Sequence, residues 1–495
     1  GPNSGKAELF AWRHREASKN KYFPRNLREP GEPRSRQEPP GGFKSDECLK
    51  AGGWGKNVCV ALGDDGCISE VKFSDTCTGA DTSVACLLPA PVNAHSHVFQ
   101  RAMAGLTERR GKNLVDSFWT WRELMYRFLD QLTPEHVEAI AAMVQMEMLE
   151  AGYATNVEFH YLHHSPDGTP YQNRAEMADR IIAAAEQTGV GLTLLPVHYE
   201  FGGCDGRSLT RGQIRFKNDL DDFAALCQSV RPTLKRLGPD ACFGIAAHSL
   251  RAVSKDSFSH SRNLSSGGPF HMHLAEQTAE VDEVLHHLGC RPVEWVLENI
   301  EPNLDCCFIH CTQMLPHETK ALAQTGAVAG LCPMTEANLG DGIFDGFNWL
   351  EAGGRIAIGS DSNIRISLSE ELRSLEYSQR LRDRSRNVLA TSALSTGRRI
   401  FESMTLGGSQ AAGRKTGRIE AGYWADLLAI DTSAITHVGS NGDIIIDTFI
   451  FAGDDRLVRE VWSAGRHVVT SGQHFAHEQI TENYRSVLFA VKDWL

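Results

Sequence analysis

The chain has 495 residues, of which 41% are hydrophobic and 23% are charged, a composition that excludes fibrous, collagen-like and wholly disordered proteins. Its 50 Lys and Arg residues against 62 Asp and Glu residues give a net charge of -12. This is the wrong sign for binding nucleic acid or an anionic membrane through bulk charge, so any anionic ligand must be met by local cations.

The first forty residues differ in composition from the rest of the chain. They contain six of the 19 prolines and few aliphatic side chains, which is too little apolar surface to offset the entropy of ordering. We expect residues 1–47 to be a disordered extension or an added leader, with Gly1-Pro2 as a cleavage scar. The N-terminus lacks a secretory signal, and no apolar run reaches the ~18 residues of a spanning helix. These features favour a cytoplasmic protein.

The thirteen cysteines are an odd number and contain no Cys-x-x-Cys pair. The pattern indicates neither a disulfide framework nor a thiolate zinc site, so we expect reduced and mostly buried thiols.

Both ends of the remaining chain are rich in short β segments. Residues 57–62 and 68–73 flank a Gly-Asp-Asp-Gly turn and predict a hairpin, and residues 426–431, 443–450 and 458–462 are further strand candidates. We predict a small β-sandwich domain built from residues 48–86 and 407–475, followed by a helical tail over 476–495.

The middle of the chain, residues 87–406, alternates strands with helices. Thr133 and Pro134 supply an N-cap and an N1 proline for a helix through Glu150. Eight buried strands are predicted, a count that indicates an α/β fold of the (β/α)8 TIM-like barrel class. Their ranges are 86–92, 156–161, 192–197, 242–248, 270–274, 306–310, 327–331 and 356–359.

Residues able to bind metal occur at the carboxyl ends of these strands, where a barrel builds its active site. His95 and His97 follow the first strand, and positions i and i+2 of an extended chain face the same side. His273, His310 and Asp361 stand at the ends of the fifth, sixth and eighth strands. Three imidazoles with one carboxylate suit a divalent ion, zinc first, with a coordination position left for water.

The strings His95-Ser-His97, His273-Leu-Ala-Glu276, His310 and Gly359-Ser-Asp361 together resemble the amidohydrolase superfamily. The resemblance implies a barrel with a small β-sandwich made from both chain ends. The predicted fourth strand lacks the lysine that bridges two metals in some members, which points to the one-metal branch. That branch implies metal ligands at His95, His97, His273 and Asp361, with His310 orienting water or substrate.

Four longer strings, within residues 93–105, 158–164, 335–344 and 370–377, resemble the formimidoylglutamate deiminase family. The resemblance implies metal-dependent hydrolysis of N-formimidoyl-L-glutamate to N-formyl-L-glutamate and ammonia in histidine degradation, and a homodimer. It implies catalytic roles for Glu276, His310 and Asp361. The substrate residues that it implies are Gln100, Arg122, Tyr161, His248 and Arg251.

The inventory of side chains agrees with a dicarboxylate substrate, since Arg122 and Arg251 can each fork onto a carboxylate. Two alternatives remain open: a one-metal deaminase acting on a purine, pterin or guanidino compound, and a scaffold without activity. Trp119 and Trp121 are interpreted as a lid or dimer contact. The inward-facing residues of 158–164 depend on a strand register that the sequence leaves open.

Overall fold

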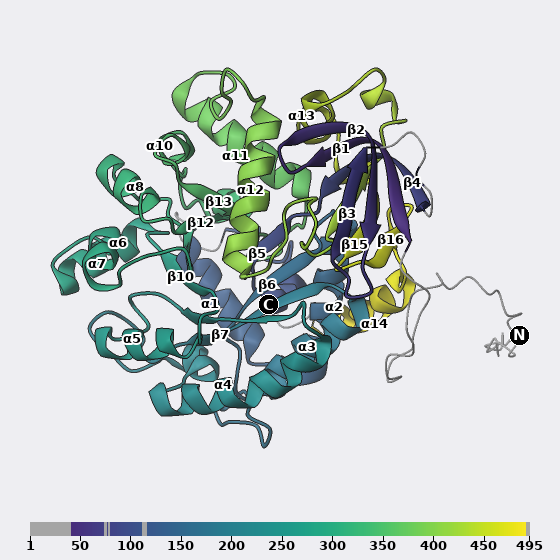
Figure 1. The fold of residues 1–495 in the computed structure, drawn as a ribbon. Coiled ribbons are helices and arrows are strands. Elements are labelled where there is room, and N and C mark those ends of the chain that lie inside the picture. The colour runs from purple at the N-terminus through teal and green to yellow at the C-terminus, as the bar shows by residue number, and fades with distance from the viewer. Residues whose placement is uncertain (1–40, 74–76, 78–79, 111–115, 492–495) are drawn as a thin grey trace, which may run out of the picture.

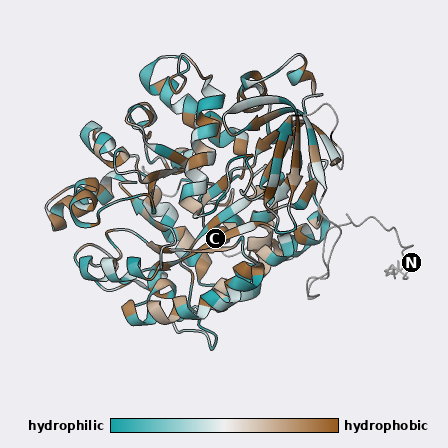
Figure 2. Cartoon of the chain, viewed as in Figure 1, coloured by the Kyte–Doolittle hydropathy of each residue, from teal (hydrophilic) through white to brown (hydrophobic). Residues whose placement is uncertain are grey.

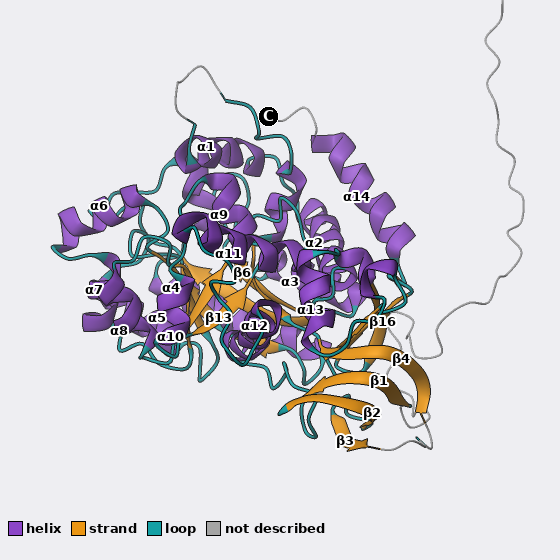
Figure 3. Cartoon of the chain, turned by 90° about the horizontal axis from the view of Figure 1, so that it is seen from above, coloured by secondary structure: helices purple, strands orange, loops and turns teal. Residues whose placement is uncertain are grey.

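The computed structural model describes residues 41–73, 77, 80–110 and 116–491. Of the extension expected over residues 1–47, residues 1–40 lie outside this described part, and residues 42–47 belong to a strand. A central barrel of strands is surrounded by helices, and a second, curved sheet lies at one side of it (Figures 1 and 3). The purple and yellow colours of that second sheet in Figure 1 show that it combines the two ends of the chain.

The barrel is a closed parallel sheet. Its strands follow the order β6-β5-β13-β12-β11-β10-β9-β7-β8, and β6 also pairs with β7 to close the ring. Strands β8 and β9 share one position interrupted at Gly244, so the ring has the eight positions of a (β/α)8 barrel. The barrel strands are β5 (Val92–Ser96), β6 (Thr155–His160), β7 (Gly191–His198), β8 (Cys242–Phe243), β9 (Ile245–Ala247), β10 (Phe270–Leu274), β11 (Cys306–His310), β12 (Val328–Leu331) and β13 (Arg355–Ile358).

Helices cover the outside of the barrel and cap its ends (Figure 3). They mix teal and brown in Figure 2, as expected for amphipathic helices that turn one face to the barrel. The α-helices are α1 (Phe118–Leu129), α2 (Pro134–Glu150), α3 (Glu176–Thr188), α4 (Leu220–Leu234), α5 (Lys255–Asn263), α6 (Thr278–Leu288), α7 (Pro292–Asn299), α8 (Pro316–Ala323), α9 (Pro333–Leu339), α10 (Gly346–Glu351), α11 (Leu368–Asp383), α12 (Thr396–Ala412), α13 (Asp443–Phe451) and α14 (His477–Val491). The described 3-10 turns are η1 (Val98–Met103), η2 (Arg211–Phe216), η3 (Lys235–Leu237), η4 (Ile435–His437) and η5 (Asp455–Leu457).

The helix predicted after Thr133 is confirmed as α2. The Thr133 hydroxyl accepts a hydrogen bond from the backbone N–H of His136 at 3.3 Å, and Pro134 occupies the first turn, where no N–H is needed.

The first predicted barrel strand, residues 86–92, is wrong. Residues Ala80–Pro89 form β4 of the other sheet, and the barrel begins with β5 at Val92. Pro89 and Pro91 lack the N–H that a continuous ladder requires, so the chain breaks there and crosses between the two sheets. His95 therefore lies inside the first barrel strand instead of beyond its end.

The strand predicted over residues 443–450 is also wrong, because these residues form helix α13. The buried side chains Ile445, Ile446, Phe449 and Ile450 recur at helical spacing and pack against α11 and α12. Tertiary packing here overrides the strand preference of three consecutive isoleucines. Arg398 and Trp54 also donate to the Asp443 carboxylate at the start of the helix, at 3.0 and 2.7 Å.

The second sheet has the order β17-β16-β15-β14-β4-β1-β2-β3. The rings of Phe43 on β1 and Trp462 on β15 lie 4.6 Å apart although two strands separate them in the sheet. Because each strand adds about 4.8 Å, this contact requires the sheet to curl over a core of its own. Its strands are β1 (Gly42–Lys50), β2 (Gly53–Leu62), β3 (Ile68–Phe73), β4 (Ala80–Pro89), β14 (Leu427–Ile430), β15 (Val458–Ser463), β16 (Arg466–Thr470) and β17 (Gln473–His474).

Three of the expected boundaries fall inside single elements. The boundary at 47/48 falls within β1, which begins at Gly42, the boundary at 86/87 falls within β4, and the boundary at 406/407 falls within α12. Helix α12 packs against β5, β12 and β13, so all of it covers the barrel. The expected helical tail corresponds to α14 up to Val491.

A buried ion cluster joins the sheet to the barrel. The guanidinium of Arg414 contacts the Asp426 carboxylate at 3.0 Å and that of Asp240 at 3.3 Å, and Arg466 on β16 reaches Asp240 at 2.6 Å. Arg414 and both aspartates are buried, so each charge depends on its partner for stabilisation.

The expectation that all thiols are reduced is wrong for one pair: Cys59 on β2 is bonded to Cys77, 18 residues along the chain, and the other eleven cysteines are free. The pairing follows from the fold, which returns the chain past β2 after β3. Within the described part of the chain, no helix has the length and apolar character needed to cross a bilayer.

Candidate active site at the carboxyl ends of the barrel strands

The four predicted metal ligands come together at one end of the barrel. His95 lies in β5 and His97 follows it, His273 lies in β10, and Asp361 follows β13. The Nε2 atoms of His95 and His273 are 3.1 Å apart. The Asp361 Oδ1 atom lies 3.4 Å from His95 Nε2 and 3.2 Å from His97 Nε2. The three imidazole nitrogens therefore form one cluster, and the Asp361 carboxylate adjoins it beside His95 and His97.

The protons of two of these imidazoles are directed away from that cluster. The Nδ1 atom of His97 lies 3.0 Å from the Phe159 carbonyl, and the Nδ1 atom of His273 lies 3.0 Å from the His248 carbonyl. A carbonyl only accepts, so each Nδ1 carries the proton and each Nε2 presents a lone pair to the cluster. This is the tautomer in which histidine binds metal.

The charge states of the cluster also fit a divalent ion. Burial lowers the pKa of His95 to about 3 and that of His273 well below its usual value, so both rings are neutral. Burial opposes ionisation of Asp361, but its close contacts with His95 and His97 hold its pKa well below the usual range. Neutral imidazoles around an ionised carboxylate match the donor set of a zinc-class ion.

Backbone contacts hold Asp361 against β5. Its N–H donates to the His95 carbonyl at 2.9 Å, and its carbonyl accepts from the N–H of His97 at 3.0 Å. A Cβ at Gly359 would lie 2.6 Å from the backbone nitrogen of His95, so only glycine permits this approach. Asp361 has a φ of 46°, a strained left-handed conformation that these two hydrogen bonds maintain.

A buried amide and hydroxyl network supports the same junction, and the sequence interpretation missed it. The Asn93 side chain donates to Ser360 Oγ at 2.7 Å, and Ser360 donates to Asn363 Oδ1 at 2.6 Å. Asn363 in turn donates to Ser96 Oγ at 3.1 Å. All four residues lie within four positions of His97 or Asp361 in the sequence. This closeness to the predicted metal ligands is the signal that could have identified them.

Glu276 and His310 lie beside the cluster. The Nε2 atom of His310 is 3.6 Å from Glu276 Oε1 and 3.7 Å from Asp361 Oδ2, and its Nδ1 is 3.2 Å from Glu336 Oε1. Burial opposes protonation of His310, but Glu276, Glu336 and Asp361 raise its pKa well above the usual value. Burial raises the pKa of Glu276 to about 7, which suits a group that takes up and releases protons at neutral pH.

The predicted catalytic and substrate residues line one cavity above the cluster, and His95 lies fully buried beneath it. Gln100 donates to the hydroxyl of Tyr161 at 2.9 Å, and its own amide oxygen is buried without a hydrogen-bond partner. The cavity is lined by His97, Gln100, Phe118, Trp121, Arg122, Met125, Tyr126, Tyr161, Tyr199, Phe216, His248, Arg251, His273, Glu276, His310, Leu339, Asp361 and Ser362.

Two cations stand in this cavity without a carboxylate partner. Among the described residues, neither Arg122 nor Arg251 forms an ion pair, and the buried Nε of Arg251 has no hydrogen-bond partner. Burial opposes the charge of Arg251, yet Glu280 and more distant groups raise its pKa, so it stays a cation. Burial and the nearby Arg251 hold the pKa of His248 well below its usual value, so that ring is neutral.

Comparison with known proteins identifies the family to which this chain belongs. The model of the amidohydrolase family matches residues 86–468. The chain is an amidohydrolase. A formimidoylglutamate deiminase of Pseudomonas aeruginosa is 43% identical over 91% of this chain and 99% of its own length. A crystal structure of an amidohydrolase from Brucella melitensis superposes with a TM-score of 0.87 and 42% identity, covering 91% of this chain and all of that one.

More distant relatives share less with this amidohydrolase. A 5-methylthioadenosine/S-adenosylhomocysteine deaminase of Natronomonas pharaonis is 26% identical over 76% of this chain and 80% of its own. A zinc-bound adenosine deaminase from Xanthomonas campestris, with a TM-score of 0.74 and 20% identity over 91% of this chain and 98% of that one, shows the fold alone.

The polar run of residues 158–164 takes no part in the cavity of this amidohydrolase apart from Tyr161. Glu158 accepts the N–H of Val98 at 2.9 Å and thereby supports the turn after His97. His163 and His164 direct their Nε2 atoms to the carbonyls of Val197 and Lys217. These side chains therefore hold the loops beneath the cavity.

The sequence interpretation also missed two acids beside His310. Glu336 accepts from the N–H of Cys332 at 2.8 Å and faces His310 Nδ1. Asp341 shares a buried cluster with Glu276 and His310, and burial with the charge of Glu276 raises its pKa to about 9. Glu336 lies in helix α9 after β12 and Asp341 just beyond that helix, and both fall within residues 335–344, one of the strings that carried the family resemblance.

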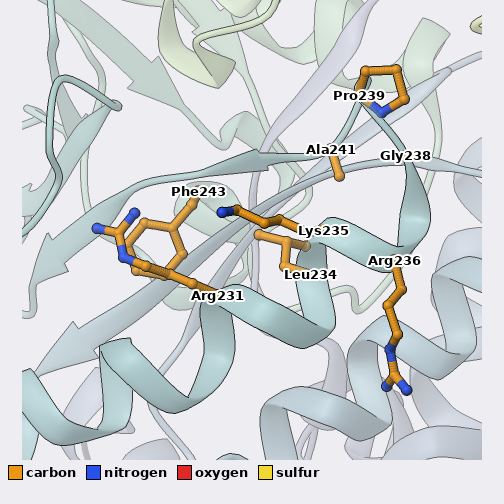
Figure 4. Close-up of a pocket in the computed structure, with 8 residues that line it drawn as sticks. All are labelled: Arg231, Leu234, Lys235, Arg236, Gly238, Pro239, Ala241 and Phe243. Atoms are coloured by element: carbon orange, nitrogen blue, oxygen red, sulfur yellow. The ribbon is translucent and has the colours of Figure 1, made fainter.

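A second cavity, of about 560 Å³, lies where α4 meets β8 (Figure 4). Strand β8 precedes β9 at the amino end of its barrel position, so this cavity is at the opposite end from the metal cluster. The guanidinium of Arg231 stacks 3.8 Å over the ring of Phe243 at one side, and the side chain of Arg236 points away. None of the predicted site residues lines it.

Proposed function

We propose that this amidohydrolase is a formimidoylglutamate deiminase, which hydrolyses N-formimidoyl-L-glutamate to N-formyl-L-glutamate and ammonia in histidine degradation. One observation carries the proposal: a cavity that ends on a cluster of three imidazoles, with the Asp361 carboxylate beside two of them, also holds two arginines that form no ion pair among the described residues. The P. aeruginosa relative that bears this name supports it.

His95, His97, His273 and Asp361 would hold one ion, for which zinc is the best fit to the donor set. When bound, that ion supplies a Lewis acid that makes water nucleophilic at neutral pH. Substrate binding and proton transfer are carried out by amino-acid side chains of the protein.

The two carboxylates of the substrate bind to Arg122 and Arg251, whose forked N–H groups match carboxylate oxygens. Gln100 and Tyr161 form one wall with a free amide oxygen, and the neutral His248 forms another. These groups orient the substrate so that the formimidoyl carbon lies beside Glu276 and Asp361.

The formimidoyl group is an amidine, so its terminal nitrogen must gain a proton to leave as ammonia. Asp361 accepts a proton from the attacking water, and the N–H of His310 donates a hydrogen bond to the attacking oxygen. Glu276 steadies the amidinium cation as a carboxylate, receives the water proton that Asp361 accepted and passes it to the departing nitrogen, because expulsion of an amide anion is prohibitively uphill. The carbon–nitrogen bond breaks as the carbonyl of the formyl group forms, and the hydroxyl proton of the intermediate passes to Asp361.

The test is ammonia release from N-formimidoyl-L-glutamate, N-formimidoyl-L-aspartate, guanine and cytosine by the zinc-loaded protein. We expect the highest kcat/KM with formimidoylglutamate. A higher kcat/KM with either heterocycle would replace this proposal with a purine or pyrimidine deaminase, and no turnover of any compound would favour the scaffold alternative.

We also retain two expectations as proposals. A homodimer is tested by light scattering of the purified protein, which should give twice the mass of one chain. Cytoplasmic location is tested by fractionation of the source cells.

A further inference from the structure

Two arginines of the cavity share one aromatic partner. The Cζ atom of Arg122 lies 4.5 Å from the centroid of the Trp119 ring, and that of Arg251 lies 5.3 Å from the same ring. Arg122 also lies 5.5 Å from the ring of Tyr126. Both distances to Trp119 are within the range of a cation–π contact, so a single indole joins helix α1 to the loop after β9.

The spacing of residues along α1 explains the contacts of Arg122 with Trp119 and Tyr126. Trp119, Arg122 and Tyr126 are three and four residues apart, which places them on the same face of a helix. Arg251 reaches the ring from the loop after β9, so its position depends on the fold and not on a local pattern.

Aromatic rings contact both of these cations. Elsewhere in the molecule, Arg380 on α11 lies 5.4 Å over the ring of Tyr377 but is also fixed by an ion pair with Glu376 at 2.7 Å. Among the described residues, Arg122 and Arg251 have no such carboxylate. The negative face of the indole lowers the energy of the two neighbouring cations.

Stacking on the ring also leaves the N–H donors of each guanidinium free to bind a ligand. The ring contacts the guanidinium carbon, whereas the N–H donors lie at the edge of the group and can fork onto a carboxylate. Side chains held in place beforehand lose less conformational entropy when the ligand binds. Two guanidinium groups fixed around one ring suit a ligand with two carboxylates.

We propose that Trp119 is a positioning residue that holds Arg122 and Arg251 for a dicarboxylate and so favours substrates with two carboxylates over those with one. This inference rests on the proposed function and deepens it. Trp119 does not itself touch the reacting atoms, so its removal weakens binding and leaves the chemical step nearly unchanged.

The experiment compares Trp119→Leu, which removes the π face, with Trp119→Phe, which keeps one. Tyr377→Leu is the matched control, since it removes a remote cation–π contact whose arginine keeps its ion pair. Trp119→Gln is a second variant in case Trp119→Leu does not fold, because the indole is half-buried. Calorimetry measures the Kd of glutarate and of its monocarboxylate analogue butyrate, and kinetics give kcat and KM for formimidoylglutamate.

We expect Trp119→Leu and Trp119→Gln to raise the Kd of glutarate and the KM about tenfold, with kcat within threefold of wild type and a smaller effect on butyrate. Trp119→Phe should recover most of the loss, and Tyr377→Leu should match wild type. Wild-type Kd and KM in folded Trp119→Leu or Trp119→Gln would overturn the inference. A wild-type protein that neither binds glutarate nor turns over formimidoylglutamate would instead overturn the proposed function.

Discussion

Replacement of Glu276 by glutamine should separate binding from proton transfer. Glu276 is buried beside His310, and burial raises its pKa to about 7, so at neutral pH it both accepts and donates protons. Glutamine has the same size and can still bind an amidinium through its oxygen, but it cannot carry a proton. A positioned general acid or base contributes about 10² to 10⁴ in rate, which corresponds to roughly 3 to 5 kcal/mol of the barrier.

We therefore expect Glu276→Gln to lower kcat by about 10²-fold or more while zinc content and the Kd of glutarate stay at wild-type values. Atomic absorption, calorimetry and ammonia release measure the three quantities. Glu283→Gln is the control, because Glu283 is an acid of the neighbouring helix that pairs with Arg207 at the surface. Near-normal kcat with metal intact would refute the role of Glu276 and transfer it to Asp361 or a histidine.

Four further predictions concern metal, substrate and stability. His273→Ala should remove bound zinc and activity together, whereas His310→Ala should keep most of the roughly one zinc per chain in elemental analysis; equal loss would make His310 a ligand. Arg251→Met should lower kcat/KM for formimidoylglutamate about 10²-fold, and a wild-type value would remove this arginine from substrate binding. Arg414→Met should lower the free energy of unfolding in urea by about 3 to 5 kcal/mol, because it leaves the buried Asp426 carboxylate without its cation while Asp240 keeps Arg466, and a loss below about 1 kcal/mol would contradict that. Burial lowers the pKa of His160 to about 3 against about 6.5 in an unfolded chain, so stability should fall as the pH drops below 6.5, by up to about 1.4 kcal/mol per unit, and His160→Phe should flatten this slope.

The barrel and its metal cluster were predictable because each depends on short stretches of chain. Residues 306–310 are an apolar run that ends on His310, residues 270–274 alternate apolar side chains with two histidines, and the structure has both strands at those bounds. Since parallel strands end at the same face of a barrel, the residues at those ends had to meet. His95, His273 and Asp361 converge for that reason.

The wrong predictions of secondary structure and of cysteine state concern segments whose local structure depends on contacts with distant parts of the chain. Helix α13 forms because its isoleucines pack on α11 and α12, and the break between β4 and β5 arises because the chain changes sheets. The bond between Cys59 and Cys77 depends on the return of the chain past β2. The contact of Trp119 with Arg251 likewise joins helix α1 to the loop after β9, which no sequence spacing relates.

The central claim, hydrolytic deimination, is tested most directly by finding out which carbon–nitrogen bond of the substrate breaks. The zinc-loaded protein is incubated with N-formimidoyl-L-glutamate in water enriched in oxygen-18, and the products are identified by mass spectrometry. The account predicts N-formyl-L-glutamate with one heavy oxygen in the formyl group and one ammonia per product, because Glu276 protonates the terminal nitrogen. L-glutamate with formamide would show cleavage of the other carbon–nitrogen bond and would contradict it.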